Sequence, residues 1–112
     1  MQVGGRRRTD ANDYFDMLRG RYEEFREAAP DDQLPVMRYY TYIGHEIRVG
    51  HVYLYEEYGT LLIQGDDGQG DQPGNPCEVI VHSHSAQVVL RYLPREAEHF
   101  EGDRRPIGFT AR

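Results

Sequence analysis

The chain has 112 residues, of which 38% are hydrophobic and 29% charged, and a formal net charge of −6. This length predicts one domain with a small core, and the acidic balance argues against general attraction to nucleic acid or anionic membranes. The sequence contains no lysine, which excludes lysine Schiff-base chemistry and the lysine-dependent phosphate loop. Its arginine-only basic composition fits either a GC-rich genome or adaptation to high salt. The single cysteine, Cys77, cannot form an internal disulfide and so favours the reducing cytoplasm.

Residues 1–8 include three consecutive arginines and are predicted to form a flexible basic arm, with a single domain over residues 9–112. An amphipathic helix is predicted over residues 10–29, because apolar residues recur there at intervals of three and four. They are Ala11, Tyr14, Phe15, Leu18, Tyr22, Phe25 and Ala29. Pro30 then disfavours helical conformation in the residue before it. We expect this helix to cover one face of a sheet, with pairing to another protein as the alternative role.

Residues 36–64 hold most of the nine tyrosines and are predicted to form strands, because Tyr, Val, Ile and Thr suit a pleated, half-buried surface. In the first strand Met37, Tyr39, Thr41 and Ile43 share one face, and Val36, Arg38, Tyr40 and Tyr42 share the other. In the second strand the apolar positions change from odd to even numbers across Gly50, which predicts a β-bulge. A third short strand follows over residues 60–64.

The segment 66–76 has three glycines, two prolines and no apolar side chain, so we expect a mobile loop. Residues 78–93 are strand-like and fit either two strands or one long bent strand. Pro94 at a first helical position and Gly102 at the far end indicate a short helix, and Ile107 and Phe109 are the expected anchors of the tail. The predicted fold class is therefore α+β. An N-terminal amphipathic helix packs on an antiparallel meander of four or five strands, with a short C-terminal helix.

One motif has the composition of a metal site. On a strand, His82 and His84 point to the same face, so both imidazoles could reach one metal ion. Such a pair needs a third ligand, for which His51 is a candidate, and an open position for catalysis. The run EVIVHSHS resembles the JAMM-type zinc peptidases, but Ser85 stands in place of that motif's proline. Tyr92 and Arg95 stand where the family has its serine and aspartate, so a metal ligand is missing. We therefore do not assign the chain to that family. The alternative prediction is a metal-dependent, hydrolase-like enzyme centred on His82 and His84, with zinc or another transition metal.

The leading prediction rests on the surplus of tyrosine. One helix covers one face of the sheet, so we expect Tyr40, Tyr42, Tyr53 and Tyr55 on an uncovered face beside Arg38 and Arg48. The open alternative is a second core layer closed by the C-terminal helix. Tyrosine and arginine are enriched at protein interfaces. We therefore predict a non-enzymatic protein-binding module without a cofactor. It would be an inhibitor or immunity-type partner, or a self-assembling subunit such as a virion component. We expect a cytoplasmic location unless the protein is part of a virion.

Overall fold

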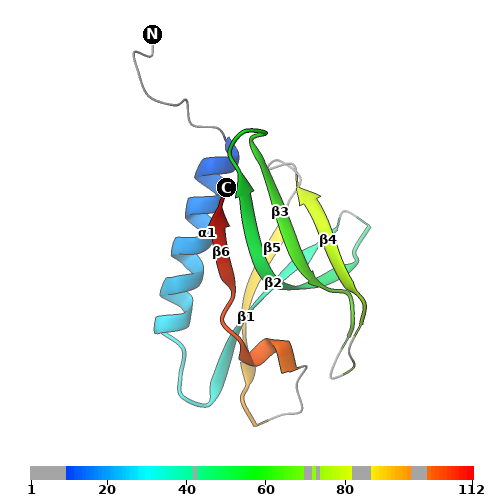
Figure 1. Cartoon of the computed structure of the whole chain (residues 1–112). Helices are drawn as coiled ribbons and strands as arrows, with labels where there is room; N and C mark the ends of the chain where they lie inside the picture. Colours follow the sequence, from blue (N-terminus) through cyan, green and yellow to red (C-terminus); the bar gives the residue numbers. More distant parts are fainter. Residues whose placement is uncertain (1–9, 42, 70–71, 73, 82–86, 97–100) are drawn as a thin grey trace.

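The computed structural model describes residues 10–41, 43–69, 72, 74–81, 87–96 and 101–112. Within these ranges one helix, α1 (Asp10–Glu27), precedes five strands and a 3-10 turn, and a sixth strand follows (Figure 1). The elements after α1 are β1 (Gln33–Tyr40), β2 (Glu46–Tyr55), β3 (Thr60–Asp66), β4 (Pro76–Val81), β5 (Gln87–Pro94), η2 (Glu101–Arg104) and β6 (Gly108–Ala111). The predicted α+β class is confirmed, with six strands where four or five were expected. The predicted arm over residues 1–8 lies outside the described residues.

Helix α1 buries the face that its sequence pattern predicts. Ala11, Phe15, Leu18 and Tyr22 are buried, and they pack with the apolar residues of the sheet. The carboxyl end of the helix is held by β5, where the Tyr92 ring stacks on Phe25 at 3.8 Å and its hydroxyl donates to the Phe25 carbonyl oxygen at 2.7 Å. The helix therefore carries one apolar stripe and is fixed against the sheet at its last turn. No helix in the described ranges has the length and apolarity needed to cross a membrane.

The sheet has the order β4-β3-β2-β1-β5, with all of these neighbours antiparallel. The first four strands form the predicted meander. The chain then crosses from β4 to the opposite edge, where β5 pairs with β1 over its full length. The described parts of segment 78–93 thus belong to two strands, on opposite edges of the sheet. The predicted meander does not include the fifth strand, because β5 pairs with β1 and not with β4.

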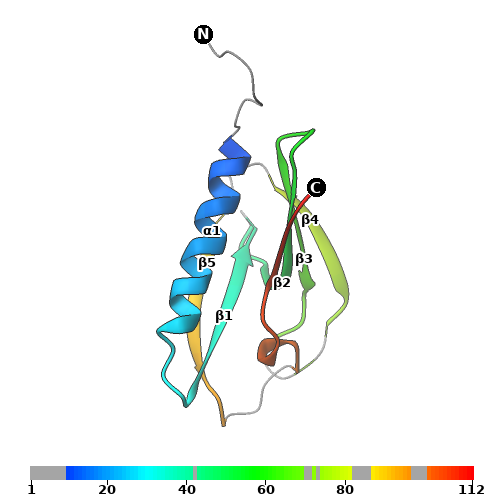
Figure 2. The same cartoon turned by 60° about the vertical axis from the view of Figure 1, so that its left-hand side comes forward.

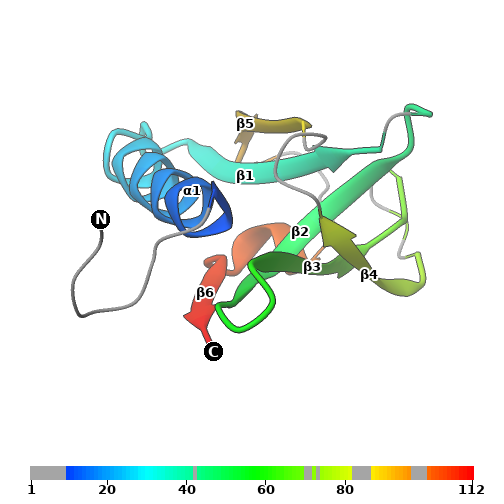
Figure 3. The same cartoon turned by 90° about the horizontal axis from the view of Figure 1, so that it is seen from above.

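Strand β2 changes partners along one of its edges. Its first residues, Glu46–Arg48, pair with β1, whereas His51 to Leu54 pair in parallel with β6. The register with β3 shifts between Val49 and His51, which confirms the bulge predicted at Gly50. A bulge increases local twist, and here β1 and β2 separate beyond it. Figures 2 and 3 show α1 alongside β1, while β6 lies beside β2.

Phe109 of β6 joins the helix to the separated half of the sheet. Its ring packs edge-on against Phe15 at 5.9 Å and tilted against Tyr22 at 5.8 Å. The Tyr22 hydroxyl also accepts a hydrogen bond from the backbone N–H of Ile107 at 3.0 Å. Both predicted tail anchors therefore pack against the core, and the tail is a strand.

The predicted short C-terminal helix is wrong. Pro94 ends β5, where it pairs with Gln33, and the only helical turn described after it is the 3-10 turn η2. Proline is compatible both with the first position of a helix and with the end of a strand, because neither position needs an N–H donor. The local sequence is therefore the same in the two cases. The long-range pairing of β5 with β1 decides between them.

Candidate functional site

The strand register assigns each predicted site residue to a face of the sheet. Residues directly opposite one another in an antiparallel pair lie on the same face. Met37, Ile47 and Val52 face α1 with the rest of the core. The opposite face, here called the outer face, carries Arg38, Tyr40, Arg48, His51, Tyr53 and Tyr55. The structure thus places these side chains together on the face that α1 does not cover, while Tyr42 lies outside the described residues.

Three aromatic rings follow one another along β2 on the outer face. The His51 and Tyr53 rings stack at 4.2 Å, and Tyr53 and Tyr55 lie 6.4 Å apart. The Arg112 guanidinium lies 4.9 Å from the centre of the Tyr53 ring, within range of a cation–π interaction. His51 Nε2 is 2.8 Å from the Thr110 hydroxyl oxygen on β6. Burial, with the nearby Arg112 charge, lowers the pKa of His51, so the neutral imidazole is favoured.

Apolar side chains continue this row across the sheet. Leu62 on β3 is directly opposite Tyr53, and Ile80 on β4 is directly opposite Leu62. Ile80 is 76% exposed, the highest value among the large hydrophobic residues described. We call Tyr53, Tyr55, Leu62 and Ile80 the tyrosine patch. It ends at β4, which has no strand on its other side among the described residues.

The two arginines of the outer face are buried, with 5% of Arg38 and 4% of Arg48 exposed. They are directly opposite each other on β1 and β2, so each needs a carboxylate to offset the repulsion. Arg38 pairs with Asp103 of η2 at 3.1 Å and with Glu46 at 3.2 Å. Glu46 also pairs with Arg91 of β5 at 3.1 Å. Arg38 is therefore the centre of an ionic network that ties η2 to three strands.

Arg48 is held from the other side of β2, by β3 and the loop that follows it. Its guanidinium bonds the carboxylate of Asp66, with Nε at 3.2 Å, and donates to the carbonyl oxygen of Gln72 at 2.7 Å. Asp66 also accepts from the N–H groups of Gly68 at 2.7 Å and Gly74 at 3.1 Å. Burial of Asp66 acts to raise its pKa, but these bonds and the Arg48 charge outweigh it and lower that pKa. The two ends of segment 66–76 are strand residues, because β3 ends at Asp66 and β4 begins at Pro76. The mobility predicted for this segment stays a prediction.

Because Arg38 and Arg48 are buried, they contribute little surface to a binding partner. The Arg38 and Arg48 side chains are engaged within the chain and expose little surface, so a binding surface on this face consists mainly of the tyrosine patch. Tyr40 lies apart from the patch, opposite Glu46 at the far end of β2, and its hydroxyl donates to Glu46 Oε1 at 3.3 Å. The outer face is thus divided into an ionic half and an aromatic half.

The structure does not test the metal hypothesis. His82 and His84 lie outside the described residues, and the proposed third ligand, His51, contacts Tyr53 and Thr110. Within the described ranges, no three histidine, cysteine, aspartate or glutamate side chains cluster as metal ligands do. Burial first, and then the carboxylates of Asp67 and Asp66, raise the pKa of Cys77, which disfavours its reactive thiolate.

Sequence reasoning missed four residues of this face, which are Leu62, Ile80, Asp103 and Arg112. Ile80 could have been found, because Cys77, Val79 and Val81 alternate toward the core and leave Ile80 on the opposite face. Asp103 and Arg112 gave no local signal, since each meets its partner only through tertiary structure. None of the family models, curated proteins or solved structures compared with this chain matches it at a significant level.

Proposed function

We propose that this protein is a non-enzymatic protein-binding module that acts through the tyrosine patch. The observation that carries the proposal is Ile80, a large apolar side chain that is 76% exposed and adjoins Leu62 and then Tyr53 in one row across three strands. Contiguous apolar surface rimmed by polar residues marks interaction sites more often than scattered apolar residues do. Tyrosine adds contact area with a polar end, which suits a surface that is alternately wet and buried.

The partner is either a second copy of this chain or a different protein, as for an inhibitor or immunity-type protein. Self-assembly is favoured by the position of the patch at β4, because an edge strand offers unpaired backbone groups to another strand. A second β4 would extend the sheet and bring the two Ile80 side chains together. The proposal retains the cytoplasmic location that the single cysteine favours, or a place in a virion.

The test compares Ile80→Asp with Met17→Asp in the full-length protein. Met17 is a matched control, because it is also a large exposed apolar residue, at 57% exposure, but lies on α1. Complete burial of an isoleucine contributes about 1.5–3 kcal/mol, so we expect Ile80→Asp to weaken association about 10- to 100-fold. Met17→Asp should leave association unchanged.

Sedimentation equilibrium of the purified protein measures self-association, and affinity capture from native lysate followed by titration of the isolated partner measures hetero-association. Circular dichroism shows whether each variant is folded. A wild-type protein that stays monomeric at high concentration and captures no partner would refute the proposal. Equal association of the Ile80→Asp and Met17→Asp variants would refute the assigned surface.

The alternative function, a metal-dependent enzyme with His82 and His84 as ligands, stays a prediction. It requires that purified protein retain stoichiometric zinc or another transition metal, and that His84→Ala release the metal. Elemental analysis of both proteins separates this alternative from the binding module.

A further inference from the structure

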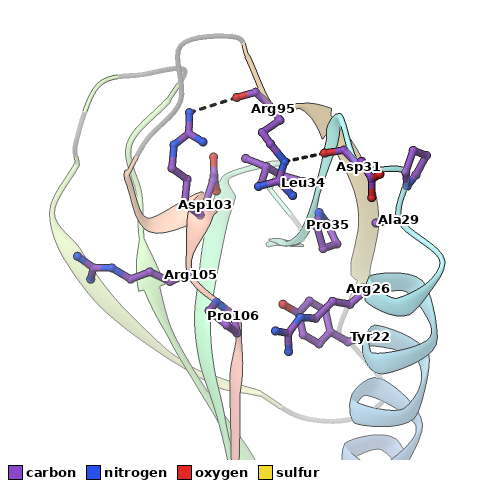
Figure 4. A pocket seen from close by; sticks show the side chains of 12 residues that line it. Tyr22, Arg26, Ala29, Asp31, Leu34, Pro35, Arg95, Asp103, Arg105 and Pro106 are labelled. Carbon is purple, nitrogen blue, oxygen red and sulfur yellow. Dashed lines mark hydrogen bonds between the residues drawn. The ribbon is translucent and has the colours of Figure 1, made fainter.

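A pocket of about 280 Å³ lies at the carboxyl end of α1, and none of the tyrosine patch residues lines it. Its walls come from the last turns of α1, the start of β1, the residue after β5, and η2 with the segment that follows it (Figure 4). This volume is just below the usual range for small-molecule sites, which begins at about 300 Å³. Leu34, Pro35 and Pro106 supply an apolar wall, so the pocket has room for a small ligand with an organic part.

The charge around this pocket is positive although the protein as a whole is acidic. Arg26, Arg95 and Arg104 line it. Arg105 also lines it, but its side chain extends away from the other residues in Figure 4. Of the two carboxylates, Asp103 is neutralised by its buried pair with Arg38 at 3.1 Å. The remaining charged groups are the three guanidinium groups and one carboxylate, that of Asp31. The pocket therefore has a surplus of two positive charges.

Two of these arginines are fixed in place by backbone carbonyl groups. Arg95 donates from Nε to the Asp31 carbonyl oxygen at 2.9 Å and from Nη2 to that of Gln33 at 3.3 Å. Arg104 donates to the Arg95 carbonyl oxygen at 3.2 Å. A guanidinium has five N–H donors, so these bonds orient both side chains and leave donors for a ligand. These acceptors are neutral carbonyl groups, so the bonds do not offset the charge of either arginine.

Arg26 and Tyr22 approach the same space from the helix. Figure 4 shows both side chains directed from α1 toward Pro106. The Tyr22 hydroxyl accepts from the Ile107 N–H, so its own hydrogen is oriented away from that group and available to donate. The Arg26 guanidinium makes no ion pair or hydrogen bond to any residue of the described part of the chain. A charged group and a buried hydroxyl thus converge on one wall.

We propose that this pocket binds the phosphate group of a small phosphate monoester. Arginine recognises phosphate through charge-assisted, fork-shaped hydrogen bonds, and a dianion matches the surplus of two positive charges. A carboxylate would offset only one of them. The carboxyl end of α1 adds partial negative charge, so binding is weak and sensitive to salt, with a dissociation constant on the order of 1 mM for two or three such bonds. This site is independent of the tyrosine patch.

The experiment is a titration of the isotope-labelled full chain with inorganic phosphate and with O-phosphoserine at constant ionic strength, followed by amide chemical shifts. With both probes we expect saturable shifts at pocket residues such as Ala29, and at the neighbouring Ile107, whose N–H bonds the Tyr22 hydroxyl. Arg26→Gln should weaken binding about tenfold, the loss of one charge-assisted bond. Arg104→Gln should also weaken it. Arg21→Gln is the matched control, because Arg21 is exposed on the same helix and pairs with Glu24 outside the pocket.

Several results would overturn the proposal. They are shifts that do not saturate, shifts centred away from the pocket, and equal affinities of the Arg26→Gln and Arg21→Gln variants. Acetate that binds as tightly as phosphate would refute the assignment of a dianionic ligand. Because Arg26 is an exposed helix residue, its replacement by glutamine leaves the fold intact, and the amide spectrum of each variant verifies this.

Discussion

The substitution Asp103→Asn tests whether the ionic network on the outer face holds η2 against the sheet. Asp103 and Arg38 lie 3.1 Å apart, and each side chain is only 6% exposed. Arg38 is also directly opposite the like-charged Arg48 in the β1–β2 register. Asparagine keeps the size of the side chain but removes its charge, so Arg38 would keep only one carboxylate partner.

The expected magnitude follows from burial. Removal of one partner from a buried ion pair lowers the free energy of unfolding by about 3–5 kcal/mol, because a charge remains desolvated without compensation. Arg38 keeps its contact with Glu46 at 3.2 Å, and that side chain is 30% exposed. We therefore expect a loss near the lower limit, about 3 kcal/mol. For a domain of this size that corresponds to a decrease in Tm of roughly 10 °C.

Urea unfolding followed by circular dichroism measures this loss, and Glu24→Gln is its control. The Arg21–Glu24 pair is closer, at 2.6 Å, but its side chains are 62% and 69% exposed. Solvent screens such a pair, so we expect a loss below about 0.5 kcal/mol. The shorter ion pair should thus contribute less than the longer, buried one.

A double variant makes the test specific. In Arg38→Met with Asp103→Leu, both charges are replaced by apolar side chains, and most of the lost stability should return. If Asp103→Asn unfolds at the same urea concentration as Glu24→Gln, the network does not contribute to stability as we reason. If the double variant is no more stable than Asp103→Asn alone, the loss is due to altered packing of η2 and not to an unpaired charge.

Four further predictions test other parts of the fold. Phe109→Ala should lower the free energy of unfolding by about 2–3 kcal/mol, because a partly buried ring leaves a cavity, and hydrogen exchange should show faster opening of β6. Gly20→Ala should stabilise the protein by up to about 1 kcal/mol in a thermal scan, since nothing lies within 4 Å of the added methyl group in the helix. Gly65→Ala should destabilise it in the same scan, because the methyl group would collide with the carbonyl oxygen of Arg48. Asp66 has a pKa below its ordinary value of 3.8, so its stabilisation is complete above that value and is lost as the pH falls through the folded-state pKa. Asp66→Asn should therefore make urea midpoints less dependent on pH below about 4, and an unchanged dependence would contradict this assignment.

The local elements of this protein follow from its sequence. The three- and four-residue spacing of Ala11, Phe15 and Leu18 fixes the buried face of α1, because side-chain direction along a helix depends only on position. The change of apolar phase across Gly50 likewise locates the bulge in β2, since a strand has a period of two residues. The same pattern assigns Tyr40, Tyr53 and Tyr55 to the face away from the helix. Each of these properties depends on neighbours within one segment.

Partners across the sheet are decided by tertiary structure alone. Nothing near Arg38 in the sequence indicates that Asp103, sixty-five residues later, will neutralise it. The sequence predicts Arg38 and Arg48 as exposed binding residues, because arginine is rarely buried unless it is paired, and the pairing is formed only when η2 and β3 reach the two strands. The same is true of β6, which pairs with β2 only because β1 separates from it beyond the bulge. Local spacing therefore determines the helix and the strand faces, whereas which charges are buried, and which side chains remain for a partner, depends on contacts between segments far apart in the chain.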